Sequence, residues 1–365
     1  MNKKNYTLAL LLVLLISFQN SWSQDSINTL KPKIDFSGYI ETYYSYDFNK
    51  PETGIRQPFL YSFNRHNEFN INLGLVKVSV TNAKYRANLA LHTGTYVSDN
   101  YAAEDEELRM INEANVGISL NSKNNLWLDA GILPSHIGFE SAIGPNNQNL
   151  TRSLLAENSP YFLTGVKLTY DPSSKWLMSV SVFNGWQRIK RLEGNSLLSL
   201  GTQLTYKKSD RLLFNWSTFI GSDSPDADRR MRYFNNLYSQ FKATNKLNFT
   251  MGFDAGFQQK FKKSNGYYVW YSPVLISQYQ ITEKWSSALR LEYYSDKHNV
   301  IVNPLGTATP FEVSGSSWNF DYAPFKIAKI RFEARYLNAS EAVFARNTAF
   351  KNDNLALTTS LSLQF

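Results

Sequence analysis

Apolar and polar residues alternate with a period of two along most of the chain, in segments of about ten residues that end at turn-forming residues. In the segment 247–261, Leu247 and Phe249 fall on one face of an extended chain, and Asn248 and Thr250 fall on the other. Successive side chains of a β-strand point to opposite faces, so this period predicts strands with one apolar and one polar face. The predicted strands are 34–48, 67–81, 85–97, 110–120, 126–133, 161–170, 176–186, 197–206, 211–221, 232–242, 247–261, 267–281, 285–296, 316–322, 327–337 and 355–365.

The last segment, LALTTSLSLQF, alternates over its whole length and stops on the aromatic residue Phe365. Roughly 9–11 residues is the length at which a tilted strand crosses a bilayer. A sheet in a bilayer has no water to satisfy its edges, so it must close, with its last strand paired to its first. We therefore predict an all-β fold, a single transmembrane antiparallel up-and-down β-barrel of about 16 strands.

The connections between these segments alternate between short and long. Turns of a few residues, such as 81–84 and 282–284, alternate with the loops 49–65, 98–108, 134–160, 187–196, 222–231, 297–315 and 338–353, and 262–266 is a short exception. Outer-membrane barrels have short periplasmic turns on one rim and long extracellular loops on the other. We predict the same arrangement here, with both termini at the short-turn rim and hence an even number of strands.

Three strands are less regular. The segment 67–81 changes phase near Leu75 and Val76, which predicts a β-bulge there. The segment 267–281 contains Pro273, which predicts a distortion or a misplaced boundary because proline cannot donate to the sheet. The segment 232–242 is apolar on both faces in places.

The N-terminus has the pattern of a secretory signal peptide. Lys3 and Lys4 precede a short apolar run, and small residues follow before Gln24. The run is shorter than the about 20 residues that a membrane-spanning helix needs, which disfavours the alternative of a retained helical anchor. We predict a signal peptide at 1–23, a short periplasmic lead-in at 24–33 and the transmembrane barrel at 34–365.

Composition agrees with an exported β-barrel. Aromatic residues make up 15% of the chain, and several lie next to short turns, as in an aromatic girdle. The chain contains no cysteine, which excludes disulfides, thiolate metal sites and lipid attachment at a cysteine. The net charge of +8 would favour anions in a pore if the charge lined it.

Charged residues alternate with apolar ones in two strands near the C-terminus. Because about sixteen strands enclose a water-filled lumen, their polar faces are expected to point inward. The candidate pore-lining residues are Arg290, Glu292, Lys329, Arg331, Glu333 and Arg335. Two interpretations stay open: a basic stripe that sets the transverse field of a channel, or charges that merely pair with one another.

The loop 134–160 is longer than a plain connection usually is. It carries His136, Glu140, Arg152 and Glu157. Folded into the lumen, it would narrow the pore and place opposite charges across it; folded outward, it would be a surface loop. We expect the inward fold, in which these four residues are the candidate constriction residues.

No pattern predicts an enzyme, a metal site, a cofactor or nucleic-acid binding. The four histidines are scattered without ligand spacing. The acidic residues at 99 and 104–107 could hold divalent ions at the outer surface, but we expect them to be solvated charge. The stretch 223–228 lacks the glycine and the distal glutamate of a calcium loop. An outer-membrane lipase would need a serine–histidine pair on the lipid face, whereas His92 falls on the polar face. The cluster at 188–191 is expected to be solvated charge rather than a lipopolysaccharide contact.

Several stretches resemble the OmpL-like β-barrel porin family, the second porin family of that kind. The resemblance rests on AGILPSHIGFESA (130–142), NQNLTRSLLAENSPYFLTGVKLTY (147–170), VFNGW (182–186), LRLEYYSD (289–296) and IRFEAR (330–335). It covers most of residues 34–365 and implies a porin of the cell outer membrane of Gram-negative bacteria. It does not name a solute.

The function expected from these observations is passive diffusion of small hydrophilic solutes or ions through a charged aqueous lumen. The alternative is a structural or adhesive surface barrel with a plugged lumen. A transporter of hydrophobic compounds would need an apolar inner pocket, which the polar inward faces do not suggest. Expected partners are outer-membrane lipid and lipopolysaccharide, the barrel-assembly machinery through the strand ending in Phe365, and other copies in a homo-oligomer.

Overall fold

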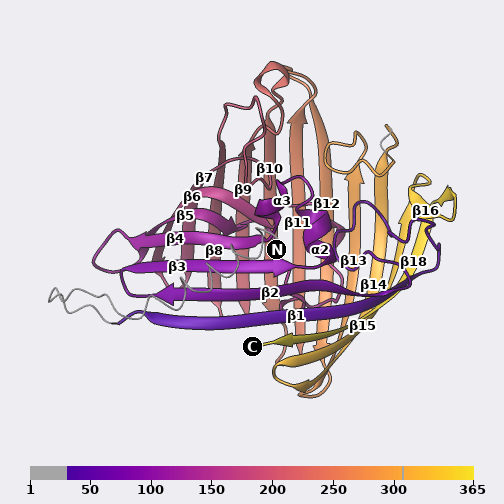
Figure 1. Cartoon of the computed structure of the whole chain (residues 1–365), viewed down its shortest axis with the longest axis horizontal. Coiled ribbons are helices and arrows are strands. Elements are labelled where there is room, and N and C mark those ends of the chain that lie inside the picture. The colour runs from indigo at the N-terminus through magenta and orange to yellow at the C-terminus, as the bar shows by residue number, and fades with distance from the viewer. Residues whose placement is uncertain (1–30, 306–307) are drawn as a thin grey trace, which may run out of the picture. The chain divides into compact units, whose positions relative to one another are not determined.

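In the computed structural model, which describes residues 31–305 and 308–365, the strands form one closed antiparallel barrel (Figure 1). Strands β1 to β15 follow one another in order, and β18 lies between β15 and β1. The barrel strands are β1(Lys33–Asp47), β2(Phe69–Thr81), β3(Tyr85–Thr93), β4(Ile111–Ser119), β5(Leu126–Pro134), β6(Phe162–Ser173), β7(Trp176–Phe183), β8(Ser199–Ser209), β9(Leu212–Gly221), β10(Arg232–Lys242), β11(Leu247–Gln259), β12(Tyr267–Gln280), β13(Trp285–Asp296), β14(Phe311–Phe325), β15(Ala328–Ala339) and β18(Asp353–Gln364). The predicted sixteen-strand barrel is confirmed; the predicted signal peptide 1–23 and most of the lead-in 24–33 lie outside the described residues.

The predicted alternation of short turns and long loops is also confirmed, including the short connection between β11 and β12. The long loops carry the remaining elements: α2(Thr95–Asn100), α3(Glu106–Arg109), η2(Gly144–Asn146), α4(Leu154–Glu157), η3(Asp226–Asp228) and the hairpin β16(Phe344–Arg346)–β17(Ala349–Lys351). Among the described residues, no helix has the length and apolar character needed to cross a membrane.

The two faces of the barrel differ in the way the period of two predicts. In β15, Phe332 and Tyr336 are exposed on the outer face, 53% and 43%, whereas Arg331, Glu333 and Arg335 are buried on the inner face. The barrel closes where β18 pairs with β1, and the backbone amide of Phe365 donates to the carbonyl of Gly38 at 3.0 Å. A closed sheet with an apolar outside satisfies its backbone without water, as a bilayer requires.

Four strand predictions need correction. The bulge in β2 lies at Asn72, which is skipped in the pairing with β1, and not near Leu75 and Val76. Strand β3 ends at Thr93, because Gly94 adopts φ +124° and turns the chain into α2; a Cβ there would lie 2.5 Å from the carbonyl oxygen of Asn72. The paired strand β7 ends three residues early at Phe183, and β14 is longer at both ends than predicted.

Pro273 distorts β12 only locally. Strand β12 pairs with β11 without interruption, but its pairing with β13 skips from Tyr271 to Val274. Proline has no N–H to donate, so the missing contacts fall on the side where its nitrogen would have been needed. The predicted distortion is confirmed, and the segment is one strand.

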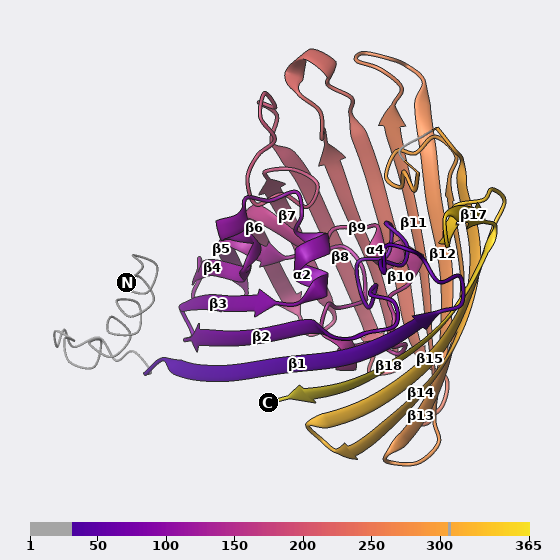
Figure 2. The same cartoon turned by 45° about the vertical axis from the view of Figure 1, so that its right-hand side comes forward.

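Two long loops fold into the barrel. In the loop 48–68, the side chains of Phe59, Leu60 and Phe63 are 2% exposed or less, and in the loop 135–161, Leu150 and Leu154 are fully buried. Helices α2 and α4 lie within the ring of strands (Figure 2). The first of these loops packs against the start of β14, three strands from β1 in the barrel, with the rings of Phe59 and Phe311 4.7 Å apart. The lumen therefore contains packed chain as well as space.

Candidate functional site

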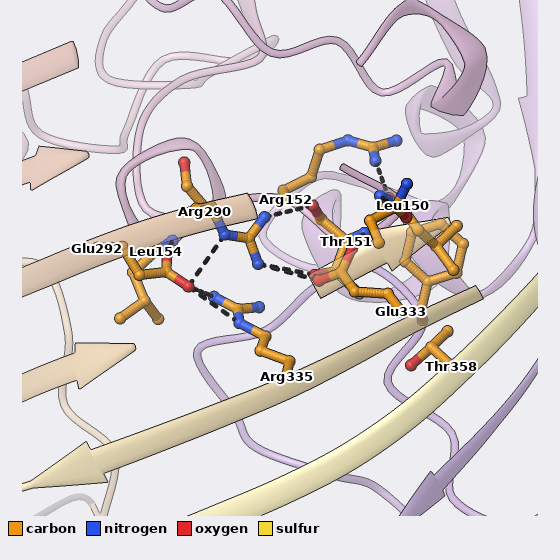
Figure 3. A network of polar contacts seen from close by, with 12 residues as sticks. Leu150, Thr151, Arg152, Leu154, Arg290, Glu292, Glu333, Arg335 and Thr358 are labelled. Carbon is orange, nitrogen blue, oxygen red and sulfur yellow. Dashed lines mark hydrogen bonds and ion pairs between the residues drawn. The ribbon is translucent and has the colours of Figure 1, made fainter. Parts of the chain in front are cut away.

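The loop 135–161 is bound to the barrel wall by charged side chains of β13 and β15 (Figure 3). The guanidinium of Arg290 donates to the carbonyl oxygen of Thr151 at 2.6 Å, and Glu333 accepts from the amide of Thr151 at 2.8 Å and from its hydroxyl. One turn further, Glu292 accepts from the amide of Leu154 at 2.6 Å. Ionic groups that hydrogen-bond backbone in a buried setting make strong contacts, so these residues fix the loop's position.

A second set of contacts holds residues 144–147 of the same loop. Arg331 donates to the carbonyl oxygens of Gly144 at 2.8 Å and Asn147 at 3.1 Å, and it pairs with Asp321 at 2.7 Å. Lys329 donates to the carbonyl of Pro145 at 3.3 Å. The loop is thus attached along η2 as well as along α4.

The six candidate pore-lining residues all come from the inner face of the barrel, but five of them are covered by the loop. Arg290 and Arg331 are fully buried, and Glu292, Glu333 and Arg335 are 5% exposed or less; only Lys329 is half-buried. Arg335 and Arg290 both pair with Glu292, at 2.8 and 3.2 Å. Of the two interpretations that the sequence leaves open, these contacts favour charges that pair with one another and with loop backbone over a water-facing basic stripe.

His136 and Arg152 of the loop contact protein rather than open space. The ring of His136 is hydrogen-bonded to the carbonyl of Thr218 at 2.9 Å and stacks on Phe183, and burial lowers the pKa of His136 to about 4. Arg152 donates to the carbonyl oxygens of Ser141 and Leu150, both at 2.6 Å, and so folds the loop onto itself. Both side chains shape the loop without facing a cavity.

Glu140 and Glu157 each line a cavity in the barrel. Glu140 accepts from the amide and hydroxyl of Ser153, and burial raises the pKa of its carboxyl group. Glu157 accepts from the amide of Tyr61 at 2.9 Å through one oxygen, and burial raises the pKa of Glu157 to about 7. Two side chains of the loop that carry carboxyl groups are therefore part of cavity walls.

The two cavities lie on either side of the end of the loop. The inner cavity, about 360 Å³, lies between the loop and the wall of β2 to β4 and includes Leu73, Leu75, Tyr96, Tyr101, Glu113, Ile137, Phe139, Glu140, Ser159 and Tyr161. The outer cavity, about 320 Å³, lies among the long loops and includes Tyr61, Glu104, Glu157, Ser159, Trp186, Arg188, Asp223 and Arg232. Ser159 belongs to both, so residues 156–161 separate one space from the other.

The inner cavity has a more apolar wall than the sequence suggested. Leu73 and Leu75 of β2 point inward, and the loop adds Ile137 and Phe139. Its carboxyl groups belong to Glu140 and Glu113, and Glu113 accepts two hydrogen bonds from Lys77 at 2.9 and 2.8 Å. The polar inward faces suggested that the barrel has no apolar inner pocket, and this expectation needs correction. Polar and apolar side chains both line the inner cavity.

Sequence reasoning missed several residues that hold the loop. Asn319 accepts from the amide of Leu150 at 3.0 Å, Asn236 accepts from the amide of Gly138 at 3.0 Å, and Tyr39 accepts from the amide of Gly144 at 3.0 Å. All three lie on inward faces of strands, which the period of two does predict. Their partners are backbone groups of a distant loop, and no sequence pattern records such contacts.

A family model described as "Putative beta-barrel porin-2, OmpL-like" matches residues 33–365, the whole of the barrel. The chain belongs to this porin family. Localisation and class follow from the membership: the porin resides in the outer membrane. A comparison with curated proteins found no match.

Solved structures similar to this porin are outer-membrane channels. The anion-selective porin from Comamonas acidovorans has a TM-score of 0.60 at 9% identity, over 92% of this chain and 100% of its own. OmpF of Salmonella typhi, in complex with daunomycin, gives 0.61 at 11% over 92% and 100%. The channel DcaP of Acinetobacter baumannii gives 0.58 at 13% over 91% and 98%. At such low identity these likenesses establish the fold of the porin.

Proposed function

We propose that the porin lets small hydrophilic solutes or ions diffuse passively through its lumen, and that the end of the loop 135–161 is the constriction. Solutes would enter the outer cavity, pass residues 156–161 and leave through the inner cavity. The observation that carries this proposal is that Ser159 lines both cavities. A residue shared by two spaces lies at the boundary between them, where a passing solute is closest to the wall.

The proposal divides the charged residues into two groups. The first group anchors the loop to strands β13 and β15 and consists of Arg290, Glu292, Arg331 and Glu333. Glu140 and Glu157 present carboxyl groups to the path itself. We propose that the channel works without catalysis and without a cofactor, because diffusion down a gradient requires only a shaped and charged passage.

The absence of cysteine from the chain allows a direct test. A single Ser159→Cys variant is reconstituted in planar bilayers and treated with a thiosulfonate reagent that adds a charged group. We expect single-channel conductance to fall by half or more on modification. The matched control is Ser340→Cys, which is exposed on a surface loop and whose modification should leave conductance unchanged. Unchanged conductance in a modified Ser159→Cys channel would place the path elsewhere.

One observation favours the alternative of a plugged surface barrel, since two loops pack inside the lumen. The same recordings separate the alternatives. A plugged barrel gives no ohmic steps before modification, whereas the proposed porin gives steps that the reagent reduces.

We further propose the expected partners as part of this function. Outer-membrane lipid and lipopolysaccharide would contact the apolar outer face, and the barrel-assembly machinery would engage β18 and Phe365. A homo-oligomer is proposed as well; among structurally similar proteins, OmpT of Vibrio cholerae is described in a trimer form.

A further inference from the structure

The outer cavity contains charges of both signs that the protein leaves incompletely paired. The Nε atom of Arg188 and the Oδ1 atom of Asp223 are 3.7 Å apart, and neither atom has a hydrogen-bond partner among the described residues. The side chains of Arg188 and Asp223 keep 22% and 19% of their surface exposed. Buried polar groups in proteins are nearly always hydrogen-bonded, so an unsatisfied pair beside a cavity indicates a place for a ligand.

Glu157 adds a third charged group to the same cavity. It is 2% exposed, one carboxylate oxygen is held by the amide of Tyr61, and the other has no hydrogen-bond partner within the described chain. The cavity wall thus offers guanidinium groups from Arg188 and Arg232 and carboxylates from Asp223 and Glu157. A third carboxylate in the wall, that of Glu104, is already bound to backbone amides.

The loop that carries Arg188 is held in place by neighbouring loops. Glu104 accepts from the amides of Ile189 and Lys190 at 3.0 and 3.1 Å. The side chain of Gln187 accepts from the amide of Tyr161 at 2.8 Å, which ties this loop to the proposed constriction. The backbone on both sides of Arg188 is therefore fixed, which reduces the entropy that ordering this loop on binding would cost.

An aromatic wall completes the cavity. The ring of Trp186 lies edge-on to Phe219 and Phe234, with centroids 5.0 and 4.9 Å away, and the guanidinium of Arg232 lies 5.1 Å from its centre. Val300 and Ile301 add aliphatic surface. These side chains give the cavity an apolar side next to its charges.

From these contacts we infer that the outer cavity is a binding site for a small zwitterion with an apolar side chain, of the size of a free amino acid. Its carboxylate would bind the guanidinium of Arg188, its ammonium group would bind Asp223 and Glu157, and its side chain would lie against Trp186. The volume of about 320 Å³ falls at the lower end of small-molecule sites, roughly 300–1,000 Å³. The inference rests on the proposed function, since it names the class of solute that the porin would take up.

The mixed charge disfavours solutes with a single charge. A simple anion that approached Arg188 would also meet Asp223 and Glu157, and a simple cation near Asp223 would meet Arg188 and Arg232. Discrimination of this kind uses repulsion against the wrong solute as well as attraction to the right one. Only a molecule with one positive and one negative group can bind both Arg188 and Asp223.

Three matched solutes test the inference: L-phenylalanine, phenethylamine, which lacks the carboxylate, and 3-phenylpropionate, which lacks the ammonium group. Binding to the full porin in detergent is measured by calorimetry, and block of the ion current is measured in planar bilayers. We expect L-phenylalanine to bind about tenfold more tightly than either analogue. Equal binding of the three solutes, or no binding of any, would overturn the inference without any variant.

Two variants assign the charges. Arg188→Ala should weaken L-phenylalanine about tenfold and should not weaken phenethylamine, which loses a repelling charge. Asp223→Asn should weaken L-phenylalanine and should not weaken 3-phenylpropionate, for the same reason. Lys190→Ala and Asp228→Asn, two exposed positions outside the cavity, are the controls and should change nothing. Weakening of all solutes alike in either cavity variant would contradict the assigned contacts.

The conductance separates this inference from the function on which it rests. Ohmic steps without selective binding of L-phenylalanine leave the porin function standing and remove the zwitterion site. Selective binding without ohmic steps supports the site and contradicts the diffusion path.

Discussion

Glu333 of β15 accepts a hydrogen bond of 2.8 Å from the backbone amide of Thr151, a residue 182 positions earlier in the chain. The same carboxylate lies 3.2 Å from Arg290, whose guanidinium donates to the carbonyl of Thr151. Both the backbone N–H and the backbone C=O of Thr151 are therefore bound by an ion pair of the wall. This buried cluster is one of several places where the loop 135–161 is bound to the strands.

Removing this carboxylate should loosen the loop. In Glu333→Ala, Thr151 loses its acceptor and Arg290 loses one of two acidic partners; breaking a buried pair in this way typically costs about 3–5 kcal/mol. We expect a lower temperature for the heat-induced shift in gel mobility and larger current fluctuations. Glu341→Ala, an exposed acid in a surface loop, is the control and should behave as the wild type.

The charge of Glu157 should make ion selectivity depend on pH. Burial raises the pKa of Glu157 from 4.5 to about 7, so the group ionises as the pH rises through neutrality. Because the folded chain holds this proton more tightly than the unfolded chain, stability should fall between about pH 4.5 and 7, and cation preference should rise through pH 7. Reversal potentials at pH 5.5 and 8.5 measure the second effect. In Glu157→Gln the two values should coincide, and a persistent difference would assign the effect to another group.

Glu113 should set part of the selectivity of the inner cavity. Its carboxylate pairs with Lys77 at 2.8 Å, and both side chains keep some exposure. Glu113→Gln removes the negative charge and leaves Lys77, so the permeability ratio should shift toward anions, as measured under a salt gradient. Glu312→Gln, paired with the exposed Lys297 outside both cavities, is the matched control. A shift of the same size in the control would mean that the reversal potential reports general surface charge.

Gly131 of β5 should not tolerate a side chain. Its φ is +127°, and a Cβ would lie 2.1 Å from the carbonyl oxygen of Ala114 in the neighbouring strand. Gly131→Ala should therefore cost about 1–3 kcal/mol in backbone strain and separation of β4 from β5. Gly74→Ala, where the nearest atom would be 3.5 Å away, should change stability by less than about 1 kcal/mol. Heat-induced mobility shifts of the two variants measure the difference.

The fold could be predicted in detail because one physical rule acts on every strand. An apolar residue such as Phe332 faces lipid, and a charged residue such as Arg331 cannot. Each strand segment therefore alternates between apolar and polar residues. The wrong strand predictions lie where the alternation of lipid-facing and inward-facing residues breaks down. At Gly94 the chain leaves the sheet, and at the bulge both Asn72 and Leu73 are buried.

The site was predictable only in part. Strand periodicity predicts that the side chains of Arg290 and Glu333 point into the barrel. It does not predict that the loop 135–161 buries them, because that loop lies far away in the sequence. The meeting of Arg188 and Asp223 depends on how two loops approach each other. Loops have no period, so their contacts are set by tertiary packing alone.

The pairing of β18 with β1 also constrains how the chain reaches its native state. The hydroxyl of Ser360 donates to Glu41 at 3.0 Å across 319 positions of sequence. During synthesis β1 is made long before its partner, and it presents a free edge until every intervening strand has emerged. Such high contact order slows folding and prolongs the time during which unpaired strand edges are open to aggregation.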